Sequence, residues 1–189
     1  AIEPAGDIES LRLSCEEVSD LKLPANQEVE LDNISGNTME IETLIDVNDS
    51  PMVELNVLKS SDNKEFTRIM FFKGRGYKRD RKKPRPGVVS IDTSCSSILS
   101  DVRSRPPETA DIPMGVREPL KLRVFIDKSI LEVFVNGKQC LAVRVYPGKK
   151  DSKGVSLRSQ GCSTMVKYLK AWQMDNIYSD QGNFSQNSF

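Results

Sequence analysis

The chain of 189 residues contains no histidine. Without an imidazole it has no Ser-His-Asp or Cys-His catalytic arrangement. None of its four cysteines has the spacing of a metal-ligand pair, so we expect no zinc site. We also expect no other cofactor, because no phosphate-binding glycine loop is present.

The chain also lacks an excess of either charge and any long apolar run. Its 27 basic and 27 acidic residues give a net charge of zero, which provides no overall attraction to nucleic acid or acidic lipid. No apolar run approaches the ~20 residues that span a bilayer, and the N-terminus lacks the layout of a signal peptide. We therefore predict neither a nucleic-acid nor a membrane partner. The start at Ala1 is typical of a fragment or processed subunit, so we expect any signal peptide to lie upstream.

Cysteine and asparagine positions bear on the compartment. The cysteines are Cys15, Cys95, Cys140 and Cys162. They permit three complete pairings, among which the sequence does not choose. Cys140 falls in an expected strand, where we predict a buried free thiol. Glycosylation triplets begin at Asn33, Asn48 and Asn183, although Pro51 directly follows the second. These triplets favour an extracytoplasmic location (secreted, cell wall or vacuolar).

A hairpin signal stands near the centre of the chain. Asn136-Gly137 separates the apolar runs 130–135 and 140–145, and this dipeptide favours a type I′ turn because both central residues need a positive φ. In the preceding segment 120–126, apolar residues alternate with others, which is the period of a half-buried strand. The segment 118–160 is therefore predicted to be a run of antiparallel strands.

The remaining segments also favour an all-β domain. We predict further strands at 10–17, 29–32, 39–46, 52–58, 66–73, 87–92 and 164–174. The last of these also fits a helix, and the all-β context decides for a strand. Residues 21–25 are predicted to be irregular, 33–36 to form a turn, and 93–113 to cross between sheets as an ordered loop. Short strands at this spacing indicate a sandwich or barrel. We divide the chain into a linker (1–8), a β-sandwich module (9–178) and a tail (179–189).

The segment 73–86 is a basic loop with eight Lys or Arg residues and one acid. Clustered cations of this kind suit a polyanion. The alternative is a solvated connection between strands, balanced by acids elsewhere, and the zero net charge favours it.

Three segments carry a resemblance to a known family. They read FIDKSILEVFVNG (125–137), RVYPGKKDSKGVSLRSQG (144–161) and LKAWQMDNIY (169–178), and the opening PAGDIESLR (4–12) is similar to an interdomain linker. Together they resemble the C-terminal β-sandwich of glycoside hydrolase family 32, which includes invertases, inulinases, levanases and fructan exohydrolases. The resemblance implies a sandwich of two antiparallel sheets. It also implies a partner, the catalytic β-propeller, on the same or a separate polypeptide, which cleaves β-fructofuranosyl bonds with retention. An oligosaccharide contact and an oligomer contact are compatible with this role.

The family's catalytic motifs are missing from this chain. Retaining glycosidases need a nucleophilic and an acid/base carboxylate about 5 Å apart, which the family draws from Asn-Asp-Pro-Asn, Arg-Asp-Pro and Glu-Cys motifs. Here no Asp is followed directly by Pro, Arg79-Asp80 is followed by Arg81, and Cys15-Glu16 reverses Glu-Cys. We therefore predict that the chain alone hydrolyses no glycosidic bond.

The family-like motif residues are interpreted as structural. They are Asp127, Ser129, Glu132, Phe134, Asn136, Gly137 and Trp172. In one continuous strand Asp127 and Glu132 would face opposite sides, and a turn near Lys128-Ser129 would change that. We expect Asp127 to cap a turn and Glu132 to make a polar contact. Trp172 is predicted to lie in the core or at an interdomain contact, with sugar stacking as the alternative for it and for Tyr146 and Tyr178.

A module that docks on a catalytic domain needs an apolar patch larger than that of most monomers. We expect this patch in the last third of the chain, at Trp172 or the Phe125 face, near the chain entry at 10–12. The rival interpretations are a free-standing lectin-like sandwich and a polyanion-binding module that uses the basic loop.

Overall fold

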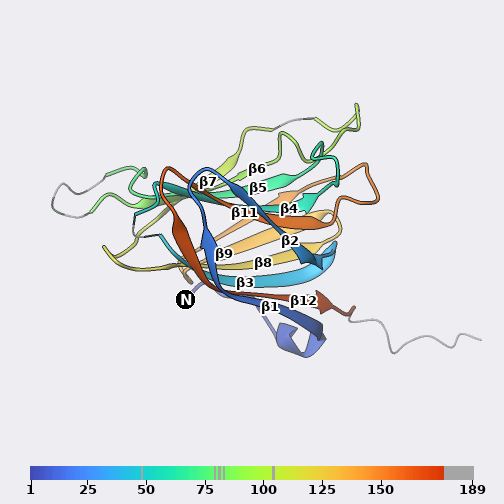
Figure 1. The fold of residues 1–189 in the computed structure, drawn as a ribbon, viewed down its shortest axis with the longest axis horizontal. Coiled ribbons are helices and arrows are strands. Elements are labelled where there is room, and N and C mark those ends of the chain that lie inside the picture. The colour runs from blue at the N-terminus through green and yellow to red at the C-terminus, as the bar shows by residue number, and fades with distance from the viewer. Residues whose placement is uncertain (48, 79, 81, 83, 104, 177–189) are drawn as a thin grey trace, which may run out of the picture.

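A computed structural model describes residues 1–47, 49–78, 80, 82, 84–103 and 105–176, and it contains two six-stranded antiparallel sheets packed face to face (Figure 1). Sheet A consists, in spatial order, of β1 (Arg12–Leu23), β12 (Thr164–Met174), β3 (Thr38–Asp46), β8 (Leu120–Asp127), β9 (Ile130–Val135) and β10 (Gln139–Arg144). Sheet B consists of β2 (Glu28–Ser35), β11 (Gly154–Gln160), β4 (Met52–Lys59), β5 (Thr67–Phe72), β6 (Gly87–Asp92) and β7 (Glu108–Ile112). A 3-10 turn, η1 (Ile8–Leu11), precedes β1. The predicted sandwich of two antiparallel sheets is confirmed.

The core forms where the inner faces of the two sheets meet. In β8 the alternating residues Leu120, Leu122, Val124 and Ile126 are buried, as the sequence pattern predicts. In β4, Val53, Leu55 and Val57 cover the facing sheet in the same way. The period-2 pattern thus positions the apolar side chains of both sheets in one continuous cluster.

The predicted hairpin is present. Asn136 and Gly137 have φ values of 51° and 62°, and the Lys138 N–H donates to the Val135 carbonyl at 2.9 Å. Val135 pairs with Gln139, so the connection between β9 and β10 comprises residues 136–138. We call the end of the sandwich that carries this turn the hairpin end. The opposite end carries the β4–β5 connection and the segment 145–153, and we call it the Glu65 end.

Three predictions of local structure are wrong. β1 extends to Leu23 across the segment predicted to be irregular, because it pairs with β12 over that whole length. β2 continues to Ser35 through the predicted turn, because it pairs with β11. The supposed loop 93–113 contains β7, which stays in the sheet of β6, so the crossing to sheet A follows β7. In each case partners distant in the sequence override a weak local signal. The segment 164–174 is a strand, as predicted.

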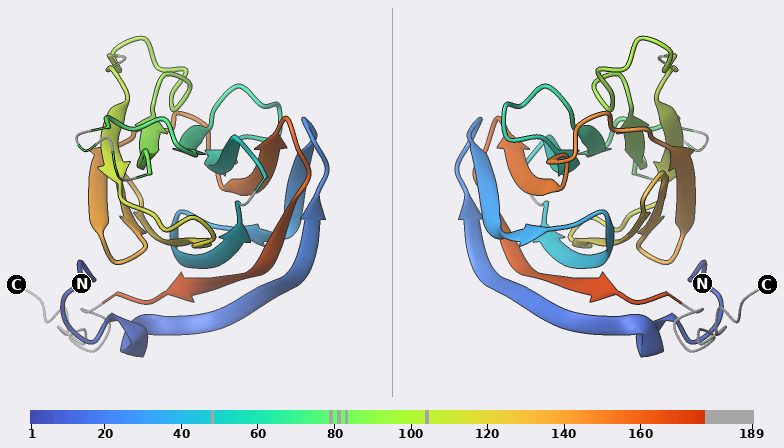
Figure 2. Two further views of the ribbon diagram at one scale, coloured as in Figure 1. Left: turned by 90° about the vertical axis from the view of Figure 1, so that its left-hand side faces the viewer. Right: turned by 90° about the vertical axis from the view of Figure 1, so that its right-hand side faces the viewer.

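The N-terminal segment lies against the outside of sheet A. The Ile2 N–H donates to the Gly137 carbonyl at 2.8 Å, at the hairpin end. η1 and the first residue of β1 lie near the opposite end, since Arg12 pairs with Met174. Figure 2 shows this segment below β9 and β10 and beside the start of β1. Residues 2–11 therefore cross the sheet, and Ala1 lies beside the β9–β10 turn.

Candidate functional site

The two motif carboxylates lie on the same face of sheet A. A turn at Lys128, whose φ is 53°, separates β8 from β9, and Asp127 pairs with Ile130 while Phe125 pairs with Glu132. Asp127 and Phe125 are two residues apart in one strand, so both carboxylates point outward. Among the described residues neither carboxylate makes a hydrogen bond or an ion pair, and their assignment to capping and polar contact stays a prediction.

The other motif residues shape the β8–β9–β10 meander. The Ser129 carbonyl accepts the Val145 N–H at 2.9 Å, which closes the Glu65 end of β10. The rings of Phe125 and Phe134 pack edge to face, with centroids 5.9 Å apart. The Asn136 carboxamide oxygen accepts the Lys121 N–H at 2.9 Å, so this side chain also links the turn to β8.

Trp172 lies half-buried on the outer face of sheet A rather than in the core. The Arg12 guanidinium stacks on its ring at 3.9 Å from the centroid. The same guanidinium donates two hydrogen bonds to the fully buried carboxylate of Glu40, at 2.8 and 2.9 Å, and Arg123 donates a third at 2.5 Å. Burial by itself raises the pKa of Glu40, but these hydrogen bonds outweigh it and hold the pKa below its ordinary value. One face of the indole is thus covered by an ion-paired arginine.

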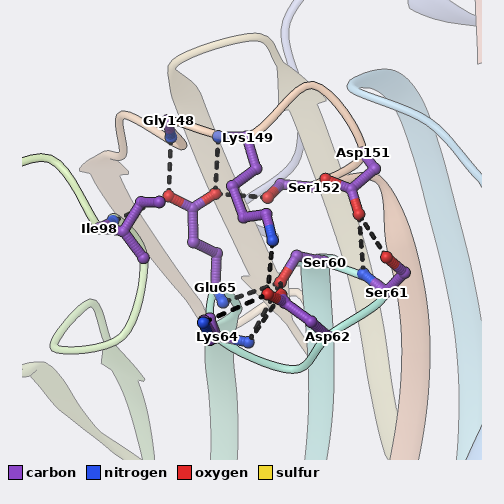
Figure 3. Close-up of polar contacts among 10 residues, drawn as sticks. All are labelled: Ser60, Ser61, Asp62, Lys64, Glu65, Ile98, Gly148, Lys149, Asp151 and Ser152. Carbon is purple, nitrogen blue, oxygen red and sulfur yellow. Dashed lines mark hydrogen bonds and ion pairs between the residues drawn. The ribbon is translucent and has the colours of Figure 1, made fainter.

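A second buried carboxylate, Glu65, holds together the connections at its end of the sandwich (Figure 3). Its Oε1 accepts the N–H groups of Ile98 and Gly148, each at 2.8 Å. Its Oε2 accepts the Lys149 N–H at 3.0 Å and the Ser152 hydroxyl at 2.5 Å. Burial opposes ionisation, but the hydroxyl and the three N–H groups together lower the pKa of Glu65. Glu65 therefore links the chain at Ile98 to the segment 148–152.

An ion pair and two hydrogen bonds at the surface also join the β4–β5 connection to the segment 145–153. The Lys149 ammonium pairs with Asp62 at 2.6 Å, and this contact lowers the pKa of Asp62. Asp151 accepts the hydroxyl and the N–H of Ser61, at 2.5 and 3.1 Å. No local pattern in the sequence marks Glu65 or Glu40 as a centre of contacts, and sequence reasoning missed both.

The large exposed apolar side chains do not gather where the sequence analysis places the docking patch. Trp172 and Phe125 are half-buried. The exposed large apolar side chains among the described residues are Ile2, Leu13, Tyr77, Ile98, Leu99, Val116, Ile130, Tyr146 and Met165. Leu13, Ile130 and Met165 belong to strands of sheet A. Tyr77, Leu99 and Tyr146 instead line grooves beside β7 and β10.

Two grooves are hollowed beside β7 and β10. The one at the hairpin end has a volume of about 470 Å³, and its lining includes Tyr77, Pro113, Met114 and Gln139. The one at the Glu65 end has a volume of about 480 Å³. We call it the arginine groove because its lining includes Arg103, Arg105 and Arg144. Sequence reasoning missed these three arginines, which fall in segments without a motif for a binding site.

The remaining predicted sites are placed as follows. Asn33 is exposed on the edge strand β2, whereas Asn48, Asn183 and Tyr178 lie outside the described residues. All four cysteines are free, and Cys140 is exposed, which contradicts the predicted burial, because its side chain lies on the outer face of an edge strand. In the part of the basic loop 73–86 that the structure describes, the Tyr77 N–H donates a hydrogen bond to the Asp111 carboxylate at 3.2 Å.

The described residues contain no group of His, Cys, Asp or Glu side chains arranged to hold a metal ion. In that part of the chain no helix is long and apolar enough to cross a membrane.

Comparison with known proteins gives consistent matches. A family model described as "Glycosyl hydrolases family 32 C terminal" matches residues 7–173. The chain is 25% identical over 205 residues to an acid beta-fructofuranosidase of Vicia faba, covering 93% of this chain and 31% of the relative. It is 24% identical over 177 residues to a levanbiose-producing levanase of Bacillus subtilis, again covering 93% and 31%. The chain thus spans about a third of the length of these relatives.

The fold has solved counterparts. The structure of fructan 1-exohydrolase IIa from Cichorium intybus superimposes with a TM-score of 0.79 at 20% identity, covering 92% of this chain and 38% of that one. The exo-inulinase from Aspergillus awamori gives a TM-score of 0.69 at 16% identity, covering 92% and 32%. At these identities the likeness concerns the fold.

Proposed function

Because this chain belongs to the C-terminal domains of glycosyl hydrolase family 32, we propose that it is the non-catalytic β-sandwich module of a β-fructofuranosidase. In this proposal the whole protein cleaves β-fructofuranosyl bonds in sucrose or fructans, and a catalytic β-propeller domain supplies the reactive carboxylates. The observation that carries it is the match over residues 7–173 to a family whose relatives are about three times as long as this chain. The absence of the catalytic motifs from this sequence supports the assignment of catalysis to a separate domain.

The hairpin end is the surface we assign to the catalytic domain. A segment that precedes Ala1 would join the module beside Gly137, where the Ile2 N–H is already bonded to the sandwich. Tyr77 and Val116 expose 74% and 75% of their surface at this end. A contiguous exposed apolar surface marks an interaction site, and the two side chains line hollows that share Pro84 and Met114. The position of Ala1 and an exposed apolar surface at the same end support docking there.

The names of the relatives also bear on the compartment. One relative from Arabidopsis thaliana is an acid beta-fructofuranosidase described as vacuolar, 28% identical over 134 residues. We assign this protein to an extracytoplasmic or vacuolar compartment on that basis. Asn33, exposed on an edge strand, is the described position best suited to a glycan.

The test compares this chain alone with the chain joined to its catalytic domain. We expect the joined protein to release fructose from sucrose, inulin or levan, and the chain alone to release none. Turnover by the purified chain alone, or none by the joined protein, would refute the proposal.

The docking surface is tested by paired variants of the joined protein. Tyr77→Ser with Val116→Ser should loosen the domain contact, so that limited proteolysis separates the domains and a hydrophobic dye binds. Leu13→Ser, at another exposed apolar position in β1, is the matched control and should do neither. Equal behaviour of the two proteins would exclude the hairpin end as the docking surface. A chain that is stable alone, shows no association with the catalytic domain and binds fructan would instead favour the lectin-like alternative.

A further inference from the structure

The arginine groove lies at the Glu65 end, between the segment 93–107 and the end of β10. Its lining combines Thr93 and Leu99 from that segment with Arg144 and Tyr146 from the chain that leaves β10. A smaller hollow of about 290 Å³ adjoins it and shares Thr93, Arg105 and Arg144. The concave surface therefore continues along the exposed edge of sheet A.

The groove presents cations without partners. Among the described residues Arg103, Arg105 and Arg144 make no ion pair, whereas other arginines of the sandwich, such as Arg12 and Arg123, hold carboxylates. Asp101 is the acid in the groove lining, and Glu108 lies in the adjoining hollow. Guanidinium groups present paired donors whose geometry matches carboxylate, phosphate and sulfate. The local charge thus favours an anion, although the whole chain is neutral.

Part of each wall of the groove is held in place before any ligand arrives. Glu65 bonds the Ile98 N–H in one wall and the Gly148 N–H in the other, each at 2.8 Å. The Ser96 and Thr67 hydroxyls are bonded at 2.9 Å, which attaches the first wall to β5. Preformed walls reduce the ordering cost of binding.

An exposed aromatic ring completes the site. Tyr146 exposes 45% of its surface at the groove. Aromatic rings combine an apolar face, against which a sugar ring can pack, with a polar hydroxyl. We propose that the arginine groove binds an acidic sugar, whose carboxylate, phosphate or sulfate group contacts the arginines while its ring packs on Tyr146.

The position of the groove separates this role from docking to the catalytic domain. Gln139 begins β10 at the hairpin end and Arg144 ends it, and at about 3.3 Å per residue the two are roughly 17 Å apart. The proposed docking surface is beside Gln139, and the groove begins at Arg144. The site belongs to this chain, so the proposal stands or fails independently of the proposed fructosidase function.

The experiment measures binding to the 189-residue chain by calorimetry at low salt. The probes are an oligogalacturonate, glucose 6-phosphate, inorganic sulfate and a neutral inulin oligosaccharide. We expect at least one acidic sugar to bind more tightly than the neutral probe, with affinity that falls as salt rises. Preference for oligogalacturonate identifies a carboxylate as the ligand group, and preference for glucose 6-phosphate identifies a phosphate. No binding of either acidic sugar would overturn the proposal.

Variants locate the site. Arg105→Gln and Arg144→Gln should each weaken acidic-sugar binding about tenfold, which corresponds to about 1.4 kcal/mol. Arg75→Gln removes the same charge from the basic loop, outside the groove, and should leave the affinity within about twofold. Tyr146→Ala should weaken binding of the acidic sugar but not binding of inorganic sulfate. All four positions are exposed, so unchanged denaturation midpoints are expected to show that the variants fold.

Two results would overturn the assignment. An equal loss in Arg75→Gln and Arg144→Gln would indicate non-specific charge attraction. Binding that disappears in the joined protein, together with domain separation in Arg144→Gln, would show that the arginines contact the catalytic domain instead.

Discussion

At the hairpin end the β9–β10 connection is held by the backbone conformations of Asn136 and Gly137, whereas at the opposite end the side chain of Glu65 fixes two connections at once. The first device is local, since its hydrogen bond joins Val135 to Lys138. The second joins residues 33 to 87 positions apart in the sequence. The turn conformation therefore depends on adjacent residues, whereas the Glu65 contacts depend on the completed sandwich. We expect the long-range contacts of Glu65 to contribute more to the free energy of unfolding than the β9–β10 turn does.

The largest expected effect is that of Glu65→Ala. This substitution leaves the N–H groups of Ile98, Gly148 and Lys149 and the Ser152 hydroxyl without their acceptor, and it removes the link between the two connections. Losing several hydrogen bonds to one buried carboxylate costs roughly 3–5 kcal/mol of unfolding free energy. Urea denaturation measures this loss. The exposed neighbour Asp62, which pairs with Lys149, gives the control Asp62→Ala, for which we expect only a small fraction of the effect.

Glu65→Gln separates the shape of this side chain from its charge. An amide that replaces Oε2 would present a donor to the Lys149 N–H, although the Ser152 hydroxyl could turn and accept from it. We therefore expect an intermediate loss. A Glu65→Ala protein with an unchanged denaturation midpoint would contradict the central role of this carboxylate.

The second effect concerns the turn itself. Gly137→Val should cost roughly 1–3 kcal/mol, because a β-branched residue resists a φ of 62°. The loss is conformational rather than steric, since a Cβ at this position would approach Ala1 no closer than 3.5 Å. Gly137→Asn, which tolerates this conformation better, should recover much of the stability. If denaturation midpoints showed Val and Asn to be equally tolerated, the positive φ would not limit the hairpin.

Features encoded by adjacent residues were predictable from the sequence, and features that depend on distant segments were not. Asn136-Gly137 encodes its turn locally, and the alternating pattern of β8 encodes its buried face, so both were predictable from a few adjacent residues. Glu65 follows a turn and looks like an ordinary surface acid. Its burial depends on segments that the sandwich brings together from three regions of the chain.

The candidate binding residues also come together only through contacts between distant segments. β7 was missed because its residues, ETADI, have little strand preference of their own and pair only when β6 is in place. Arg103 and Arg105 precede β7 in a polar segment, and they become part of a groove only when β10 lies nearby. The family resemblance gave the fold and the role of the module, but it gave no indication of this groove.

The smallest expected effect is that of a third carboxylate, Glu118, at the hairpin end. Its oxygens accept the Gly115 N–H at 2.8 Å, the Lys138 ammonium at 2.6 Å and the Asn136 carboxamide N–H at 2.8 Å. These contacts, led by the Gly115 N–H, lower the pKa of Glu118 from 4.5 to about 2. Its side chain is 30% exposed, so solvent weakens the contribution, and we expect Glu118→Gln to cost only about 1 kcal/mol near neutral pH.

The pH dependence of that cost identifies its origin. A carboxylate whose pKa is lower in the folded state stabilises the fold fully above its unfolded value of 4.5, and this stabilisation is lost as the pH falls through about 2. The difference in unfolding free energy between the wild-type chain and Glu118→Gln should therefore be constant at higher pH and shrink through the acid range. Other carboxylates titrate in both proteins and cancel in the difference. Lys138→Met should remove only part of this difference in unfolding free energy, because Glu118 still accepts the Gly115 N–H. A difference in unfolding free energy that stays undiminished in strong acid would show that Glu118 acts through its shape rather than its charge. The stability of the hairpin end would then come from the turn conformation.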